Sequence, residues 1–182
     1  MKSVLIGGIG NVLLGDDGVG PYVARLLDAY YEFDDGVEVA DLGTPALDLI
    51  DQISGKDAVI LIDSIHTGAA PGTVLLYRKA DVMGLRPAVR MDPHSPALVE
   101  TLLSTELFGS APTELSLVGI EGSSYDSGCN LSDPVNNSIQ RVIAEVLGEL
   151  ARLRVTYRRR EPPVQTGIWW ATTEKTSALR TS

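Results

Sequence analysis

Short apolar runs rich in β-branched residues alternate along this chain with longer segments that have one apolar and one polar face. Five of the apolar runs are predicted to be buried strands, at Ser3–Ile6, Val37–Ala40, Ala58–Ile62, Thr73–Tyr77 and Leu115–Gly119. Four of the longer segments are predicted to be helices, at Pro21–Tyr31, Pro45–Ser54, Pro96–Leu107 and Pro134–Leu153. This alternation indicates an α/β fold, a three-layer αβα sandwich around a sheet of about five strands.

The connection between two of these strands is short. Only about ten residues, Asp63–Gly72, separate the strand that ends at Ile62 from the strand that begins at Thr73. A crossover between parallel strands needs a dozen or more residues. At least one strand is therefore expected to be antiparallel, and the sheet to be mixed but mainly parallel.

The length, charge and hydropathy of the chain exclude several classes of protein. Its 182 residues, 44% hydrophobic and 21% charged, fit one domain. The formal net charge of -9 argues against a protein that binds nucleic acid through phosphate contacts. The N-terminal apolar run is too short for a signal peptide, and no stretch approaches the roughly 20 apolar residues of a spanning helix. We expect a cytoplasmic protein without membrane or nucleic-acid partners.

The C-terminal part of the chain differs in composition from the rest. Residues 154–182 hold six basic and two acidic side chains, together with Pro162-Pro163 and many Thr and Ser, and they have no helical or strand period. We therefore predict a domain at residues 1–153 and a basic, flexible tail at 154–182. Trp169 and Trp170 are an exception within the tail, because adjacent tryptophans could dock on the domain or on a partner.

A glycine-rich loop, Gly7–Pro21, joins the first strand to the first helix and at first resembles a nucleotide-binding loop. A dinucleotide fingerprint would need a glycine where the chain has Leu13. The phosphate loop of NTPases would need Lys and Ser or Thr where the chain has Asp16 and Asp17. Two carboxylates would repel phosphate, so no nucleotide is expected. They suit a cation instead, with the glycines letting the backbone turn tightly around it.

Asp17, Asp63 and His94 each stand where a predicted strand ends or a predicted helix begins. Asp63 directly follows the most apolar strand, and the carboxyl ends of strands border the ligand site of open α/β sheets. His94 is held in a loop between two prolines and offers an imidazole nitrogen. Two carboxylates and one histidine suit a divalent metal such as Ni²⁺ or Zn²⁺, with positions left open for substrate or water. The alternative for each aspartate is a helix cap or a turn.

Four further side chains have both a structural and a functional interpretation. Asp16 could cap the first helix or take part in the chemistry. Asp41 opens a segment that ends at Thr44, which is either a plain turn with Thr44 as helix cap or a loop that contacts a peptide. His66 is either a surface residue or a substrate contact. Cys129 has no partner thiol in the sequence and is expected to be an ordinary free cysteine.

Taken in order, these segments resemble the hydrogenase maturation proteases, the endopeptidases that process the large subunit of nickel-iron hydrogenases. The resemblance rests on Gly8–Gly20, Asp41–Thr44, Ile62-Asp63 and Pro93-His94, and it covers about residues 3–153. It implies an αβα sandwich around a mixed five-stranded sheet, which agrees with the fold predicted from the hydrophobic pattern.

The resemblance also implies roles for individual residues. It makes Asp17, Asp63 and His94 the metal-binding residues, and members of the family have Glu or Asp at the position of Asp17. It places Asp41 and Gly43-Thr44 in a loop tied to processing.

The implied reaction is hydrolysis of one peptide bond near the C-terminus of the large-subunit precursor, after nickel has been inserted. The nickel would be supplied by the substrate and would dock on the metal-binding residues as the recognition signal. Asp16 and Asp41 are the candidates for a general base. Two alternatives remain open at this point: a non-catalytic, nickel-sensing maturation partner or chaperone, and a nucleotide-binding α/β protein.

Overall fold

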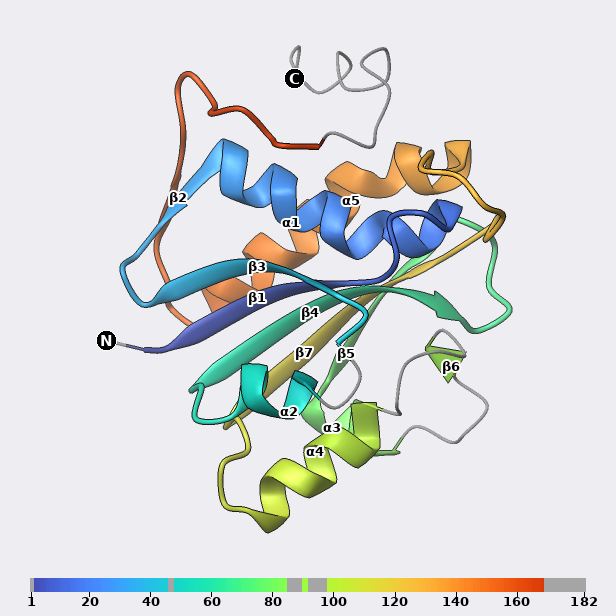
Figure 1. The fold of residues 1–182 in the computed structure, drawn as a ribbon. Coiled ribbons are helices and arrows are strands. Elements are labelled where there is room, and N and C mark those ends of the chain that lie inside the picture. Colours follow the sequence, from blue (N-terminus) through green and yellow to red (C-terminus); the bar gives the residue numbers. More distant parts are fainter. Residues whose placement is uncertain (1, 46–47, 85–89, 92–97, 169–182) are drawn as a thin grey trace.

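The computed structural model describes residues 2–45, 48–84, 90–91 and 98–168, and its centre is a mixed sheet (Figure 1). The strands lie in the order β3-β1-β4-β7-β5. Their bounds are β1 Val4–Ile9, β3 Val37–Gly43, β4 Ala58–His66, β5 Val74–Arg78 and β7 Glu114–Glu121. Strands β1, β3, β4 and β7 are parallel, whereas β5 is antiparallel to β7. The predicted mixed, mainly parallel sheet is therefore confirmed, as is the antiparallel strand expected after the short connection.

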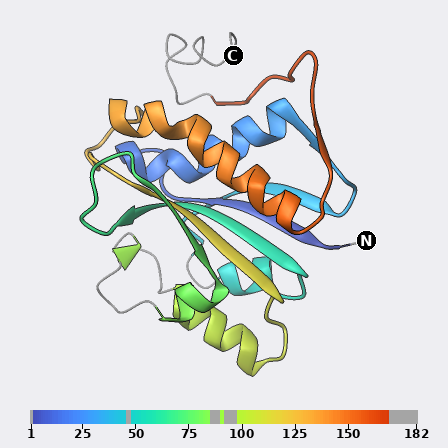
Figure 2. The same cartoon turned by 180° about the vertical axis from the view of Figure 1, so that it is seen from behind.

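Helices cover both faces of this sheet and complete the predicted sandwich (Figures 1 and 2). One face packs against α1 (Val19–Tyr30) and α5 (Asp133–Arg152). The other packs against α2 (Asp48–Ile53), α3 (Lys79–Gly84) and α4 (Leu98–Leu107). Helix α3, which has six residues, was not predicted.

Strand β4 is the centre of the hydrophobic core. Ile60 and Ile62 pack into the cluster beneath α1 and α5, whereas Val59, Leu61 and Ile65 pack into the cluster beneath α2, α3 and α4. All five side chains are at most 1% exposed. The strand is therefore buried on both faces, as its continuous apolar run indicates.

Helix α1 begins in direct contact with the sheet. A Cβ atom at Gly20 would collide with the backbone carbonyl oxygens of Ile9 on β1 and Ile62 on β4. Since neither oxygen belongs to a flexible side chain, only glycine allows this close approach. The first turn of α1 is thereby held against the carboxyl ends of β1 and β4.

The residues that follow α5 are joined to the body of the protein by a small second sheet. Strand β8 (Tyr157–Arg159) pairs antiparallel with β2 (Tyr31–Phe33), which directly follows α1. Further on, the backbone N–H of Val164 donates to the carbonyl oxygen of Ala29 at 3.1 Å. The domain boundary predicted at residue 153 therefore leaves out a strand that pairs with the domain. Three-residue strands show no alternation in the sequence, so the hydrophobic pattern could not predict them.

Some of the predictions concern residues that the structure does not describe. Trp169 and Trp170 lie outside the described residues, so their docking stays a prediction. Cys129 is described and is a half-buried free thiol. Among the described helices, none has both the length and the apolar character needed to cross a bilayer. The cytoplasmic location stays a prediction.

Candidate active site

The strand order creates a topological switch point between β1 and β4. From β1 the chain passes through α1 to β3 on one side, whereas from β4 it continues towards β5 on the other side. Ligands of open α/β sheets bind outside the carboxyl ends of the strands at such a point. The two predicted metal-binding carboxylates, Asp17 and Asp63, belong to the loop after β1 and to the second half of β4.

Asp17 lies in η1, a 3-10 turn at Gly15–Gly18 that leads into α1. Its side chain is buried, and its Oδ2 accepts a hydrogen bond from the backbone N–H of Asn11 at 2.6 Å. At Gly10, φ is 135°, and a Cβ atom there would collide with the carbonyl oxygen of Asp17. The loop thus folds back on itself at a glycine, and this brings the carboxylate to the end of β1.

Asp63 is the first residue of β4 beyond the end of its pairing with β1. The last paired residues are Gly8 on β1 and Ile62 on β4, while Asp63 itself pairs with Gly119 on β7. The turn η1, which carries Asp17, contacts β4. Asp17 and Asp63 are each 1% exposed. Two buried carboxylates offer oxygen donors of the kind that divalent cations bind.

His94, the third predicted metal-binding residue, lies outside the described residues. The described chain before it ends with β6 (Arg90–Met91), which is antiparallel to the end of β4 and pairs Met91 with Ile65. Among the residues that are described, no three His, Cys, Asp or Glu side chains cluster closely enough to hold a metal. The complete set of Asp17, Asp63 and His94 therefore stays a prediction.

Asp16 has a structural role that the sequence did not predict. Its carboxylate is fully buried and accepts four hydrogen bonds from the loop before α5, donated by the backbone N–H groups of Ser123 (2.7 Å), Ser124 (2.9 Å) and Ser132 (2.7 Å) and by the Ser132 hydroxyl (2.8 Å). Helix α1 has Gly18 at its N-cap and no side-chain cap, so Asp16 does not cap it. Because four donors engage its lone pairs, Asp16 is a poor candidate for a general base.

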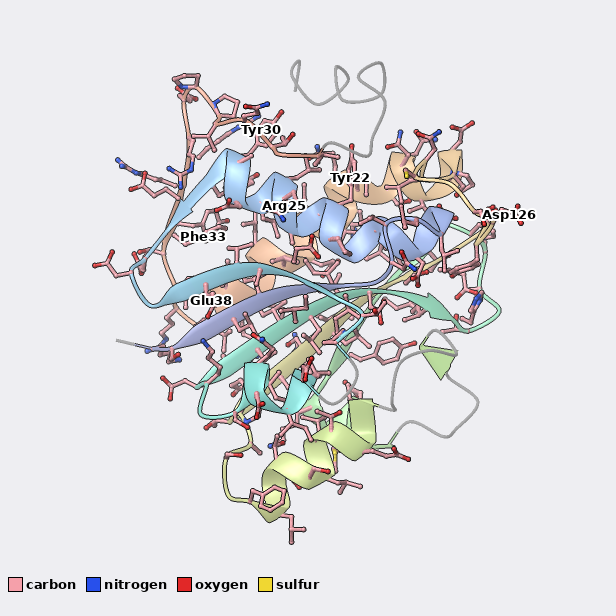
Figure 3. The ribbon with its side chains drawn as sticks, viewed as in Figure 1. Tyr22, Arg25, Tyr30, Phe33, Glu38 and Asp126 are labelled. Carbon is pink, nitrogen blue, oxygen red and sulfur yellow. The ribbon has the colours of Figure 1, made fainter. Side chains whose placement is uncertain are left out.

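Asp41 lies within β3 and not in a turn. Its Oδ1 accepts a hydrogen bond from the backbone N–H of Gly43 at 3.1 Å, and its Oδ2 lies 3.5 Å from Arg25. Arg25 projects from α1 (Figure 3). The predicted helix cap at Thr44 is wrong, because α2 begins only at Asp48. Strand β3 extends through Gly43, so the segment lengthens the edge of the sheet beside the site.

Of the polar residues grouped beyond Asp63, only His66 was recognised from the sequence. The Ser64 hydroxyl is 2.6 Å from the phenol oxygen of Tyr125, and the Tyr125 ring centroid is 4.6 Å from that of His66. Tyr125 belongs to the loop between β7 and α5, and Asp126, next to it, lies at the same end of the sheet as η1 (Figure 3). The signal available in the sequence was a single aromatic residue in a stretch rich in Ser and Gly.

Glu121, at the end of β7, holds the loop that follows β4. Its carboxylate accepts hydrogen bonds from the Thr67 N–H (2.8 Å), the Thr67 hydroxyl (2.7 Å) and the Gly68 N–H (3.1 Å). Burial raises the pKa of Glu121, but these hydrogen bonds and the charge of His66 outweigh it and hold the pKa below its ordinary value. Glu121 is therefore an ionised anchor for this rim of the site.

A family model and the relatives of known name both place this chain in the same protein family. The family model described as Hydrogenase maturation protease matches residues 21–149. The hydrogenase expression/formation protein HupM of Azotobacter chroococcum mcd 1 is 34% identical over 160 residues, which cover 87% of this chain and 77% of that protein. The Hydrogenase 2 maturation protease of Escherichia coli (strain K12) is 30% identical over 148 residues, 81% of this chain and 90% of the relative.

Solved structures agree with these sequence relationships. The hydrogenase maturating endopeptidase HybD from Escherichia coli superposes with a TM-score of 0.82 at 29% identity, over 89% of this chain and 99% of that one. The [NiFe] hydrogenase maturation protease HybD from Thermococcus kodakarensis gives a TM-score of 0.65, also at 29% identity, over 83% of this chain and 99% of that one. The resemblance seen in the sequence is thereby confirmed, and the chain belongs to the hydrogenase maturation protease family and is an endopeptidase.

Proposed function

We propose that this endopeptidase removes a C-terminal peptide from the nickel-loaded large-subunit precursor of a NiFe hydrogenase, and that the nickel of the substrate is the recognition signal. Membership of the family supports a hydrogenase precursor as the partner. The observation that carries the proposal is the burial of two carboxylates, Asp17 and Asp63, at the switch point between β1 and β4.

The chemistry of the proposed set fits nickel. Carboxylate oxygens and an imidazole nitrogen are suitable donors for a borderline divalent ion. Asp17 and Asp63 would supply the oxygens, and His94, three residues after β6 in the sequence, would supply the nitrogen. Because the nickel arrives within the precursor, a precursor without nickel would lack the group that these residues bind.

Two roles are open to nickel once it has docked. The ion can polarise the carbonyl of the scissile peptide bond, or it can lower the pKa of a bound water molecule. Both roles place the scissile bond near Asp17 and Asp63. Asp41 lies across β1 from Ile62, the residue before Asp63, at two strand spacings or about 10 Å. From there its carboxylate is better placed to contact the substrate peptide than to act as a base at the scissile bond.

The decisive experiment compares nickel-loaded with nickel-free precursor. Each is incubated with the purified enzyme, and the mass of the large subunit is followed by mass spectrometry. The proposal predicts loss of a C-terminal peptide from the nickel-loaded precursor alone. Equal cleavage of both forms would remove nickel as the signal. Binding of the nickel-loaded form without cleavage would instead support a nickel-sensing chaperone.

A further inference from the structure

Tyr125 is held beside the candidate site by a buried hydroxyl. Its phenol oxygen lies 2.6 Å from Oγ of Ser64, which is 1% exposed and directly follows Asp63 on β4. Tyr125 itself is only half-buried. Its hydroxyl is thus held against the strand that contains Asp63, while part of the residue stays exposed.

The position of the ring is restricted from several sides. A Cβ atom at Gly122 would collide with the Tyr125 hydroxyl, so the phenol lies directly over a glycine. The ring also contacts the imidazole of His66, with 4.6 Å between centroids. Asp16 holds the backbone of the two residues before Tyr125 through hydrogen bonds from Ser123 and Ser124. A side chain held in this way is pre-positioned for binding or chemistry.

The surroundings of Tyr125 also fix its protonation. Burial raises the pKa of its phenol, and although the hydrogen bond with Ser64 opposes this, the negative charges of Asp16, Asp17 and Glu121 raise it further, to about 12. At neutral pH the hydroxyl therefore keeps its hydrogen. Tyr125 therefore places a half-buried, protonated phenol at this acidic end of the sheet.

We propose that Tyr125 is a catalytic residue of this site and that its phenol O–H donates a hydrogen bond to the oxygen of the scissile carbonyl. The inference rests on the proposed function. When the oxygen of water bonds to the carbonyl carbon, the π electron pair of the C=O bond moves to the carbonyl oxygen, and the phenol stabilises that charge without giving up its proton. The C–N bond then breaks. The leaving nitrogen takes up the proton that the water has lost.

The contact with Ser64 fits this role. If the Ser64 hydroxyl donates to the phenol oxygen, the phenol hydrogen is left for the substrate. Ser64 is then a positioning residue, which aims the donor, and Tyr125 is the group that touches the reacting carbonyl. The contact also ties the loop that carries the donor to β4, the strand that contains Asp63.

The test is Tyr125→Phe, which removes only the hydroxyl. With nickel-loaded precursor in excess enzyme, the single-turnover rate of cleavage is expected to fall about 100-fold, the effect of losing one donor to a developing oxyanion. Affinity for the precursor is expected to change by less than about 3-fold, because the donor acts on the transition state. The matched control is Tyr157→Phe on β8, a tyrosine 38% exposed and outside the site, whose rate should equal that of the wild type.

A second measurement separates chemistry from structure. Fluorotyrosines at position 125 keep the hydroxyl and the shape of the ring but are stronger hydrogen-bond donors, so the cleavage rate should rise with the acidity of the free phenol. A rate that is independent of this acidity, or a Tyr125→Phe enzyme that cleaves at the wild-type rate, would overturn the role of Tyr125 alone. Failure of the wild-type enzyme to cleave nickel-loaded precursor would overturn the proposed function and this inference with it.

Discussion

Asp16 and Ser132 are 116 residues apart, yet Ser132 donates two hydrogen bonds to the Asp16 carboxylate, from its backbone N–H to Oδ1 at 2.7 Å and from its hydroxyl to Oδ2 at 2.8 Å. The carboxylate thereby joins the 3-10 turn before α1 to the loop before α5. That turn carries Asp17, and that loop carries Tyr125. Asp16 therefore fixes the positions of these two side chains relative to each other.

We expect Asp16→Asn to destabilise the protein by roughly 2–3 kcal/mol, because an amide NH₂ would face N–H and O–H donors in a buried position. The measurement is the free energy of unfolding in urea. Asp28→Asn, at an exposed position on α1, is the matched control and should change the stability by less than about 0.5 kcal/mol. Equal effects of the two substitutions would show that the four hydrogen bonds to Asp16 are not structural.

Gly20→Ala is expected to lower the free energy of unfolding by about 3 kcal/mol or more. The added methyl group would collide with the carbonyl oxygens of Ile9 and Ile62, so α1 would have to move away from the sheet. Because η1 is continuous with α1, cleavage should fall as well. Both effects can be measured on the same preparation, by thermal unfolding and by processing of the precursor.

The chain provides its own control for this substitution. Gly148 lies on the exposed side of α5, where an added Cβ would meet no atom within 4 Å. Gly148→Ala is expected to stabilise the protein by up to about 1 kcal/mol, because alanine has the higher helix propensity. A loss of stability in Gly148→Ala similar to that in Gly20→Ala would contradict the steric explanation.

Glu149, itself buried, forms ion pairs with two partly exposed arginines far from the site. On α5 its carboxylate binds Arg78 of β5 (2.9 Å), Arg152 (2.9 Å) and the Ser116 hydroxyl of β7 (2.7 Å). Burial raises the pKa of Glu149, but the hydrogen bonds from Arg78, Ser116 and Arg152 outweigh it and lower the pKa below 4.5. The ionised form is therefore favoured in the folded state.

This network predicts a pH dependence of stability. Since the pKa of Glu149 is lower in the folded than in the unfolded chain, its contribution is present above about pH 4.5 and is lost as the pH falls through the lower, folded value. Glu149→Gln should flatten the curve of unfolding free energy against pH in this range. Glu100→Gln, at an exposed position on α4, should leave the curve unchanged. Parallel curves for the wild type and Glu149→Gln would contradict this assignment.

The sequence predicted most of the fold because the main elements are long enough to show their periods. Strand β4 is a continuous apolar run, and helix α5 has 20 residues with an apolar stripe that includes Val135, Ile139 and Val142. The elements that were missed, α3, β2, β6 and β8, have two to six residues each. These short elements form through contacts with other segments of the chain, and such contacts leave no pattern in the local sequence.

Only the site residues next to a predicted strand end could be predicted from the sequence. Asp63 could be placed near the ligand edge because the apolar run ends at Ile62, although β4 itself continues to His66. The role of Asp16 could not be predicted, because its partners Ser123, Ser124 and Ser132 lie more than 100 residues away, and such a contact leaves no local pattern. Tyr125 was missed for the same reason, since its significance comes from contact with Ser64.

Two truncations test the attachment of the residues after α5. A chain that ends at residue 154 lacks Val155, which is 8% exposed and belongs to the core cluster beneath α1 and α5, and it also lacks the β2–β8 pairing. We expect it to be less stable than a chain that ends at residue 168 by about 2–3 kcal/mol, the cost of losing a buried Val and several hydrogen bonds. Urea unfolding of both chains measures the difference, and equal stability would mean that β8 contributes nothing.

The substitutions Asp17→Asn and Asp63→Asn each remove one charged oxygen donor from the proposed nickel site. We expect either variant to lower processing of nickel-loaded precursor at least about 100-fold, because a set of three donors cannot lose one without losing most of its affinity. The fold should persist, since asparagine has nearly the shape of aspartate and at position 17 retains an oxygen that can accept the hydrogen bond from Asn11. Circular dichroism and mass spectrometry of the product measure the two effects separately.

His94→Ala extends this test to the donor outside the described residues, and it should cause the same loss if the set of three is correct. Asp126→Asn is the matched control, because Asp126 is an exposed aspartate at the same end of the sheet and is not part of the proposed set. Its processing rate should remain within about 2-fold of the wild type. Near-normal cleavage by any one of the three site variants would remove that residue from the site. Near-normal cleavage by both single variants, Asp17→Asn and Asp63→Asn, would refute a metal-binding role for the switch point between β1 and β4.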